Sequence, residues 1–353
     1  MSTQTIWKAT ANLSDMREIV YFDESPDSGR AAVADPRGLS EPTWAPPEIR
    51  VDPFTGESIV IAAQRQDRTY HPATADCPLD PSEPGRATEI PASSYDVVVF
   101  ENRFPSLRNP HGRCEVMCFT SDHGSSFASL TPQRVRTVMA AWIDRTVTLG
   151  GLPEVQQVYC FENRGEEIGV TLHHPHGQVY GFPFVTPRTQ QMIAQAKAHQ
   201  DLFDEMVRAE LDAGVRVIAR NEHWVAFVPP AARWPFEVRI FPLTRVPDLS
   251  VLSAEQQEAF GPLYLKVLGG MDRMFGTPLP YIAAWHQAPG RDQGARDLFA
   301  AHLQVFSVRR AADKLKYLAG TESGMGVWIN DIVPEEAARR LRDATNEESG
   351  SAT

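Results

Sequence analysis

The residues most able to do chemistry lie together at positions 171–180, which read Thr-Leu-His-His-Pro-His-Gly-Gln-Val-Tyr. Apolar residues alternate after the histidines, as in a half-buried strand, so we expect His176 near the start of a strand. Gln178 then shares the face of His176, and Gly177 leaves room for a ligand close to the backbone. An unprotonated imidazole attacks phosphorus well, and an amide can donate a hydrogen bond to a phosphoryl oxygen. The pattern therefore indicates transfer of a phosphoryl or nucleotidyl group.

Two arginines, Arg65 and Arg68, follow a predicted hairpin and could supply the positive charge that such a transfer needs. The histidines also have two simpler interpretations, a satisfied polar cluster and a purely structural metal site. An internal repeat, described below, carries the group of three histidines in one copy only. This asymmetry favours a functional role.

The composition limits the class of protein. The 353 residues include 42% hydrophobic side chains, enough for a substantial core. With 34 basic and 45 acidic residues the net charge is -11, which argues against nonspecific binding of nucleic acid. No stretch approaches the length of a membrane span, and the N-terminus lacks a basic region followed by an apolar run, so we expect a cytoplasmic protein. Four cysteines in a chain of this length do not predict a disulfide framework.

Local signals predict a mixed α+β chain. Residues 1–45 predict a partly ordered arm with one strand, and a Pro- and Asp-rich stretch at 69–91 predicts a long loop that needs something, such as a metal, to order it. The predicted strands are residues 18–22, 96–100, 115–119, 155–161, 224–228 and 237–241, with a hairpin at 50–61. The predicted helices are residues 132–149 with Thr131 as the cap, residues 190–213, and one opening at Ser253 with a capping box to Gln256.

The pattern of elements occurs twice, with an offset of 122 to 127 residues. For example, His302-Leu303-Gln304 follows His176-Gly177-Gln178 by 126 residues. A near-constant offset over five elements is typical of a duplicated unit. We therefore predict two antiparallel-sheet-plus-helix units that share one continuous sheet with helices on one face. The second copy lacks the preceding His-Pro and has Leu303 in place of Gly177, so we expect the chemistry in the first copy.

The predicted organisation is a sequence of four parts. They are an N-terminal arm at 1–45, a first repeat with the nucleophile at 46–215, a second repeat at 216–345, and a disordered tail at 346–353.

The run His174-Pro175-His176-Gly177-Gln178 resembles the signature of the galactose-1-phosphate uridylyltransferase family, the transferase branch of the histidine-triad superfamily. Segments elsewhere resemble the family in the same order, so the resemblance covers about residues 45–345. These segments are 50–68, 100–105, 118–123, 161–165, 222–224 and 314–320. The resemblance implies a duplicated histidine-triad fold, in agreement with the repeat.

The resemblance also implies a reaction. His176 would attack the α-phosphorus of UDP-glucose, release glucose 1-phosphate and form a uridylyl-histidine, which galactose 1-phosphate would then resolve to UDP-galactose. Gln178 stands where the hydrolase branch has a third histidine, so water would lack a ready general base. By position, the residues implied to contact the uridine or its phosphates are Arg65, Arg68, Asn102, Asn163, Thr171 and Gln178.

A later segment matches the part of the family that binds the sugar phosphate. By position the matching residues are Lys316, Tyr317 and Glu322, which a second subunit would contribute, so the resemblance implies a homodimer. The alternative for this segment is a solvated Lys-rich turn.

Family members with zinc use two cysteines and two histidines, and the resemblance implies the same positions here. These are Cys77, Asp80, His123 and His174, with Asp80 in place of the second cysteine. A carboxylate is an acceptable zinc ligand, so we predict a weakened structural zinc site. The alternative is a metal-free loop in which Cys77 packs. A second metal site of some relatives is only partly present, since His286 and His302 remain but residues 186–194 contain no Glu, and we do not predict it.

Two other functions stay open at this point. One is another nucleotidyltransferase or phosphorylase of the same superfamily, acting on a different sugar phosphate or on a diadenosine polyphosphate. The other is a nonenzymatic nucleotide-binding protein that kept the fold, which we expect to have lost the nucleophile or Arg65. Neither residue is lost here.

Overall fold

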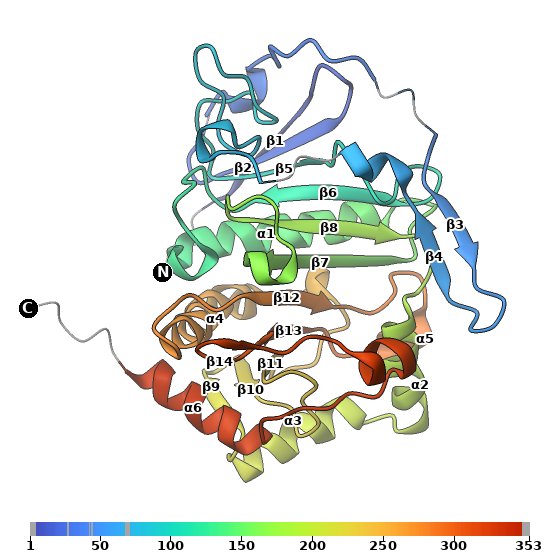
Figure 1. The fold of residues 1–353 in the computed structure, drawn as a ribbon, viewed down its shortest axis with the longest axis vertical. Coiled ribbons are helices and arrows are strands. Elements are labelled where there is room, and N and C mark those ends of the chain that lie inside the picture. Colours follow the sequence, from blue (N-terminus) through green and yellow to red (C-terminus); the bar gives the residue numbers. More distant parts are fainter. Residues whose placement is uncertain (1–4, 27, 42, 44, 68–70, 348–353) are drawn as a thin grey trace, which may run out of the picture.

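An 11-stranded antiparallel sheet runs through the whole molecule (Figure 1). The computed structural model describes residues 5–347 except 27, 42, 44 and 68–70. The strands of the sheet, in spatial order, are β1 (Trp7–Asn12), β2 (Glu18–Asp23), β5 (Val97–Glu101), β6 (Arg113–Cys118), β8 (His176–Phe182), β7 (Gln157–Arg164), β12 (Tyr281–His286), β13 (His302–Ser307), β11 (Phe236–Pro242), β10 (Trp224–Phe227) and β9 (Val217–Arg220).

The two halves of the sheet have equivalent strands in the same order, counted outward from the centre. β7 and β12 pair at the centre, β8 and β13 lie next to them, and β6 and β11 follow, then β5 and β10. Each of these pairs joins elements that the sequence repeat relates. The two copies therefore face each other across the β7–β12 pair, and the predicted α+β fold with a duplicated unit is confirmed.

Three long helices cover one face of the sheet: α1 (Pro132–Gly150), α4 (Ala254–Arg273) and α6 (Pro334–Asn346). Both predicted helix starts are correct. The Thr131 side chain accepts a hydrogen bond from the Arg134 N–H, and Ser253 and Gln256 form a reciprocal capping box. Large aromatic side chains, among them Trp142, Trp224 and Trp285, pack between these helices and the sheet. Helix α6 was not predicted.

The opposite face of the second half is also covered by helices, α2 (Pro187–Ala198), α3 (Leu202–Ala213) and α5 (Gln293–Leu298). They pack on Val225, Phe227 and Phe241, whose side chains point away from α4 because side chains alternate along a strand. The prediction that the helices lie on one face is therefore correct for α1, α4 and α6 only. The single helix predicted at 190–213 is wrong, because the chain leaves the helical conformation at His199 and restarts after Asp201. The predicted boundary at 215 places α2 and α3 with the first repeat, but they pack on the second.

In the first half, loops rather than helices cover the corresponding face. Side chains of the predicted long loop, including Cys77, Leu79 and Ile90, pack together with Tyr95 on the outward residues of β2, β5 and β6. Part of this loop forms a short 3-10 helix, η3 (Thr74–Asp76). The uncovered strip beside this loop is where β8 begins.

The N-terminal region contains two strands, not the one predicted in the arm. β1 and β2 pair with each other, and β2 pairs with β5, so residues 7–23 form the edge of the main sheet. The predicted hairpin at 50–61 is present as β3 (Glu48–Val51) and β4 (Ser58–Ile61), and Figure 1 shows it projecting from the side of the molecule. The predicted disordered tail lies almost entirely outside the described residues.

A second small hairpin, β14 (Arg309–Ala311) and β15 (Lys314–Leu315), leads to a single helical turn at Gly320–Gly324. Among the described residues, no helix is long and apolar enough to cross a membrane.

Candidate active site

His176 is the first residue of β8, in the middle of the first half of the sheet. Its Nδ1 lies 2.7 Å from the carbonyl oxygen of His174. Because a carbonyl oxygen only accepts, Nδ1 carries the proton and Nε2 keeps its lone pair. Burial lowers the pKa of His176 to about 4, so the ring is neutral at neutral pH. His176 is at the start of a strand, as predicted, and its contact with the backbone determines which ring nitrogen keeps a lone pair.

Gly177 has a different role from the one predicted. A Cβ at this position would lie 2.7 Å from the Phe161 carbonyl oxygen and 2.8 Å from Cζ of Phe119. The glycine therefore permits close packing of β8 against β7 and the core. It does not make room for a ligand, because the added carbon would point away from the face that carries His176.

A cavity of about 170 Å³ opens on the outer face of β8. It brings together most of the residues predicted to bind the nucleotide, namely Arg65, Asn102, Thr171, His176 and Gln178. The orientation of two amides is determined by their neighbours. Oδ1 of Asn102 accepts from the Phe104 N–H at 2.8 Å, and Oε1 of Gln178 accepts from the Tyr180 hydroxyl at 3.2 Å. Both NH₂ groups are thus left as donors for a ligand, as predicted for Gln178.

Arg65 lies in a short 3-10 helix, η2 (Ala63–Asp67), directly after the projecting hairpin. Its Nη1 donates to the Phe104 carbonyl oxygen at 2.9 Å, which holds the guanidinium at the rim of the cavity. The predicted partner Arg68 lies outside the described residues.

His176 also lines a second cavity, of about 440 Å³, that contains Asn163. His176 therefore lies between two cavities. Asn163 lines the 440 Å³ cavity, and the other described residues predicted to bind the nucleotide line the 170 Å³ cavity. The second cavity contains two groups that were not predicted. Glu162 is buried, and burial raises its pKa to about 8, while Arg164 pairs with both oxygens of Asp272. The signal in the sequence was the pair of charged residues, Glu162 and Arg164, at the end of the apolar strand β7.

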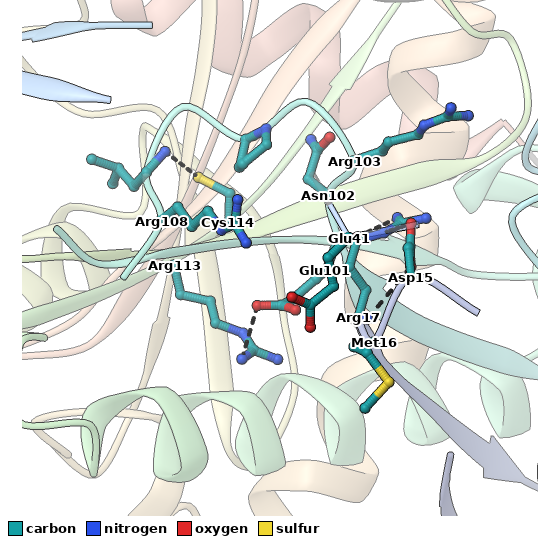
Figure 2. A pocket seen from close by; sticks show the side chains of 12 residues that line it. Asp15, Met16, Arg17, Glu41, Glu101, Asn102, Arg103, Arg108, Arg113 and Cys114 are labelled. Atoms are coloured by element: carbon teal, nitrogen blue, oxygen red, sulfur yellow. Dashed lines mark hydrogen bonds and ion pairs between the residues drawn. The ribbon is translucent and has the colours of Figure 1, made fainter. Parts of the chain in front are cut away.

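The strand end that carries Asn102 is held by ion pairs around a small cavity of about 80 Å³ (Figure 2). Arg17 bonds Asp15 at 2.8 Å and Glu89 at 2.6 Å, and Arg113 bonds Glu101 at 3.0 Å. These charges are already paired with one another. We therefore assign this cavity to the support of Asn102 rather than to ligand binding.

The segment predicted to bind a sugar phosphate does not reach His176 within one chain. Lys316 Nζ bonds Glu322 Oε1 at 2.9 Å, and Tyr317 is 74% exposed. None of the three lines either cavity that contains His176. They form a separate surface feature in this chain.

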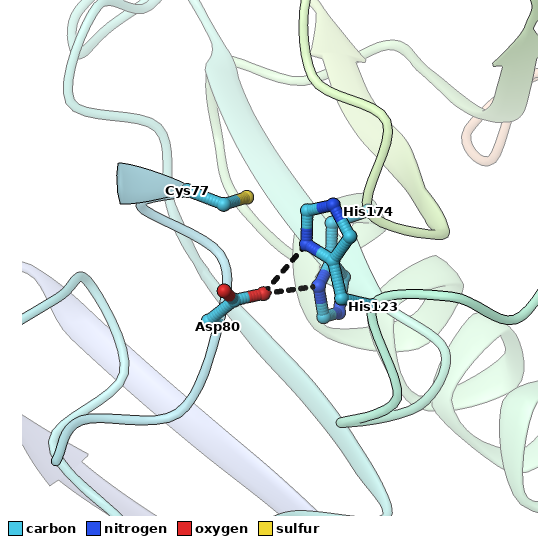
Figure 3. Close-up of side chains that lie close together, drawn as sticks. All are labelled: Cys77, Asp80, His123 and His174. Atoms are coloured by element: carbon cyan, nitrogen blue, oxygen red, sulfur yellow. Dashed lines mark hydrogen bonds and ion pairs between the residues drawn. The ribbon is translucent and has the colours of Figure 1, made fainter. Parts of the chain in front are cut away.

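The four predicted metal ligands do converge (Figure 3). One ligand atom from each of Cys77, Asp80, His123 and His174 lies within 4.8 Å of the others. Nδ1 of His123 and Nδ1 of His174 lie 2.8 and 2.9 Å from the same carboxylate oxygen, Oδ1 of Asp80. Cys77 and Asp80 come from the long loop, His123 from the turn after β6, and His174 from the segment that leads into β8.

The donor set fits a divalent cation. Nε2 of His174 faces the carbonyl oxygen of Thr120 at 2.8 Å, so that nitrogen carries the proton. Burial lowers the pKa of His174, and its Nδ1 is the ring nitrogen that faces the Asp80 carboxylate. A thiol, a carboxylate and two imidazoles are ligands that Zn²⁺ accepts.

A second group of possible ligands, His71, Glu166 and His173, was not predicted. Nε2 of His173 lies 3.0 Å from Glu166 Oε1, and all three side chains are exposed. His173 therefore contacts Glu166, although the family signature gives His173 no role.

Comparisons with known proteins agree over nearly the whole chain. The Galactose-1-phosphate uridyl transferase N-terminal domain matches residues 106–186, and the corresponding C-terminal domain matches residues 188–351. The galactose-1-phosphate uridylyltransferase of Streptomyces lividans is 48% identical over 359 residues, which cover 96% of this chain and 98% of that protein. The enzyme of Thermotoga maritima is 33% identical and covers 84% of this chain and 98% of its own length.

Solved structures give the same result. A uridylyltransferase structure superposes with a TM-score of 0.75 at 30% identity, covering 84% of this chain and 98% of that one. An ADP-glucose phosphorylase of Arabidopsis thaliana shares the fold, with a TM-score of 0.69 at 21% identity, 87% of this chain and 100% of that one being covered. Identity over nearly full length, together with the site geometry, places this chain in the galactose-1-phosphate uridylyltransferase family.

Proposed function

We propose that this chain transfers a uridylyl group from UDP-glucose to galactose 1-phosphate, through a covalent uridylyl-histidine in a ping-pong reaction. The observation that carries the proposal is the bond from Nδ1 of His176 to the His174 carbonyl. It leaves Nε2 unprotonated, in a cavity with Arg65 and the free amide donors of Asn102 and Gln178. The 48% identity to a named uridylyltransferase supports the choice of substrates.

In the first half-reaction, Nε2 of His176 attacks the α-phosphorus and the bond to the glucose 1-phosphate oxygen breaks. The new phosphorus–nitrogen bond leaves a positive charge on the ring, and the proton on Nδ1 points at the His174 carbonyl, which stabilises that charge. The N–H groups of Gln178 donate to a phosphoryl oxygen, where charge builds up in the transition state. No proton has to move in this step.

In the second half-reaction, a phosphate oxygen of galactose 1-phosphate attacks the same phosphorus and the bond to Nε2 breaks. A sugar phosphate is already ionised at neutral pH, so it needs no general base. Water does need one to attack at a useful rate, and an amide at position 178 cannot accept its proton. Gln178 therefore protects the intermediate from hydrolysis while it helps the transfer.

We assign the remaining contacts to the side chains that converge on the two cavities. Arg65, Asn102, Thr171 and Gln178 would hold the uridine or its phosphates from one side of His176, and Asn163 from the other. Arg68 is assigned to the phosphates by its match to the family alone.

Zinc is proposed at Cys77, Asp80, His123 and His174, on the convergence of their ligand atoms. When bound, it would supply a structural cross-link. Through Cys77 and Asp80 it would hold the long loop against β5 and β6, and through His174 it would hold the carbonyl that orients His176. The metal thus acts on the nucleophile through the backbone.

A homodimer is proposed because Lys316, Tyr317 and Glu322 do not reach the cavities of their own chain. Apolar side chains near them are exposed, including Tyr317 at 74% and Met325 at 80%. Burial of such side chains against a second copy is favourable and would carry the segment toward a partner's cavity. A cytoplasmic location stays a prediction.

The test is to incubate the protein with UDP-glucose alone and to identify the product by peptide mass spectrometry. We expect one uridylyl group on His176, and exchange of labelled glucose 1-phosphate into UDP-glucose without galactose 1-phosphate. An enzyme that exchanges label only when both sugar phosphates are present would contradict the ping-pong route.

Another base or sugar remains the second candidate, because the nucleophile does not select them. Comparing UDP-glucose with ADP-glucose and with diadenosine polyphosphates in the same exchange assay separates the alternatives. Preference for an adenine nucleotide would replace the proposed substrate and leave the proposed nucleophile unchanged. No adduct with any of them would instead favour a nonenzymatic nucleotide-binding protein.

A further inference from the structure

The second half of the sheet contains a cavity at the place equivalent to the active site. His302 is the first residue of β13, as His176 is of β8, and its Nδ1 lies 2.9 Å from the carbonyl oxygen of Ala300. Gln304 follows two residues later, as Gln178 follows His176. The cavity has a volume of about 460 Å³ and lies between the sheet and helices α2 and α3.

This cavity lacks an accessible nucleophile. His302 is 3% exposed, and its ring stacks on Phe241 at 4.4 Å and on His286 at 5.0 Å. The amide of Gln304 is fully used, since its Oε1 faces Nε2 of His286 at 2.9 Å and its Nε2 donates to Glu237 at 2.7 Å. These groups form a rigid wall, so the function of the cavity must come from other residues.

Three arginines from three segments line the cavity, namely Arg188 from α2, Arg233 from the loop before β11, and Arg239 from β11. Glu237 contacts Arg239 and the backbone of Arg233. It already accepts hydrogen bonds from Gln304 and from the backbone N–H of Arg233, and its Oε1 lies 3.5 Å from two nitrogens of Arg239. One carboxylate cannot balance three guanidinium groups.

The positive charge is poorly compensated elsewhere. Nε of Arg239 is buried without a hydrogen-bond partner, and neither Arg188 nor Arg233 forms an ion pair with any acidic residue in the described part of the chain. Arg233 instead lies over the ring of Trp328 at 5.8 Å. An uncompensated group of charges beside a cavity is costly unless an anion occupies the cavity.

Helices α2 and α3 contribute Met192, Leu202, Phe203 and Met206, which give that side of the cavity an apolar surface beside Gln191 and Gln195. A ligand that satisfies both walls has an anionic group at one end and a flat or apolar body at the other. Arginine binds phosphate through paired N–H groups, and the volume is in the range of cavities that hold small organic molecules.

We propose that this cavity binds an organic phosphate, with its phosphate on Arg233 and Arg239 and its body against Met192 and Phe203. A nucleoside monophosphate has the required shape and charge. Binding here is separate from the proposed transfer reaction and does not depend on it. The site is an anion site built on the strands that carry the chemistry in the other copy.

The experiment is isothermal titration of the full-length protein with AMP, and with inorganic phosphate as the probe for the anionic group alone. The double variant Arg233→Gln/Arg239→Gln should weaken binding of AMP by about tenfold or more, because each lost guanidinium removes a charge-assisted hydrogen bond. Met192→Trp, which fills the cavity and keeps the arginines, should also abolish AMP binding.

Two matched controls separate this site from others. Arg245→Gln removes an arginine of the same half that pairs with Asp204 at 3.1 Å and lines a different cavity, and Arg65→Gln alters the first site. Both should retain AMP binding, and all variants should show an unchanged melting temperature before binding is compared. The double variant Arg233→Lys/Arg239→Lys, which keeps the charge, should recover part of the affinity.

Several results would overturn the proposal. These are the absence of saturable AMP binding to the natural protein, loss of binding in Arg65→Gln with retention in Arg233→Gln/Arg239→Gln, or a stoichiometric metal that disappears in His302→Ala. Loss of uridylyl transfer activity in Arg65→Gln with AMP binding intact would show that the two sites fail independently.

Discussion

The cavities around His176 and His302 lie on equivalent strands and use the same backbone contact, but they differ in what reaches the imidazole. In both, Nδ1 faces the carbonyl oxygen two residues earlier, at 2.7 Å and 2.9 Å. His176 lines two cavities, whereas His302 lines one, is 3% exposed and stacks on Phe241 and His286. The comparison teaches that a strand start can present an imidazole in a fixed tautomer, and that the surrounding side chains decide whether it acts as a nucleophile.

The carbonyls that orient the two rings also differ in their support. The one at His174 belongs to a residue of the proposed metal site, while the one at Ala300 belongs to a small apolar residue. The first cavity thus has a stiffened nucleophile and free amide donors. The second has used its amide in a network to Glu237 and exposes arginines instead.

The largest expected effect comes from removing each imidazole in turn. His176→Ala should lower the exchange of labelled glucose 1-phosphate into UDP-glucose by roughly 10⁴-fold or more, because the covalent route is lost. His302→Ala is the matched change, and it should keep most of the exchange rate while lowering stability. Equal losses of activity in both variants would break the comparison.

The next largest effect should come from the two equivalent glutamines, Gln178 and Gln304. Gln178→Ala should reduce the exchange rate by about 100-fold, as expected for the loss of one donor to a developing charge. Gln304→Ala should instead cost about 1 to 3 kcal/mol of stability, because it removes one donor to Glu237 and leaves Nε2 of His286 without its hydrogen-bond partner. Steady-state kinetics and urea denaturation of both variants measure the two effects. An activity loss confined to Gln304→Ala would reverse the assignment.

The metal group has no counterpart in the second half. Elemental analysis should find close to one zinc per chain, and Cys77→Ser should reduce that content and lower the melting temperature by roughly 5 °C. Cys114→Ser, another buried thiol outside the cluster, controls for the loss of a sulfur atom. Zinc content that stays the same in Cys77→Ser would exclude this site.

A smaller effect is expected where the copies have Gly177 and Leu303. Gly177→Ala should cost about 1 to 3 kcal/mol of stability, since the added carbon meets the Phe161 carbonyl oxygen and the Phe119 ring. Gly124→Ala is the control, because its Cβ would meet only Asp122 Oδ1 at 3.6 Å. Chemical denaturation of both variants is the measurement. A neutral Gly177→Ala would mean that the glycine serves the ligand after all.

The last difference concerns Glu162, whose position in the second half is Trp285. Burial raises the pKa of Glu162 to about 8, opposed by the hydrogen bond from the Tyr281 hydroxyl and by Arg164, while Asp272 acts with burial. The folded state therefore keeps a proton that the unfolded state releases above its ordinary pKa. Stability should fall as pH rises from about 5 to 8, by roughly 1 kcal/mol per pH unit from this group.

Glu162→Gln should remove this part of the pH dependence, and melting curves between pH 5 and 8 would measure it. A variant with the same pH profile as the natural protein would show that the carboxyl group is ionised when buried.

Several features of the site could be predicted from local sequence. The alternating run after the histidines predicted the strand that begins at His176, and the constant offset between copies predicted the paired halves of the sheet. The four proposed metal ligands were identified by position and do converge. The capping residues Thr131 and Ser253 were correct because a helix start depends on neighbouring residues.

Other features depend on residues that are distant in sequence. Arg188, Arg233 and Arg239 meet only because α2 folds over the second half of the sheet, and no local spacing relates them. The role of Gly177 depends on Phe119 and Phe161 from neighbouring strands, and the burial of Glu162 depends on Tyr281 from the other copy. The break between α2 and α3 was missed because the helical pattern continues across it.

The sequence by itself indicated which residues could do chemistry, because the nucleophile and the amide follow from side-chain type and spacing, and the metal ligands follow from matching positions in the family that the chain resembles. The sequence also predicted that the chemistry belongs to the first copy, and the tertiary structure shows how the surroundings of the two histidines differ. His176 and His302 have the same local backbone contact, and the difference lies in side chains brought from other strands and helices. Burial, charge balance and tautomer are properties of that three-dimensional surrounding, so they appear only once the sheet is assembled.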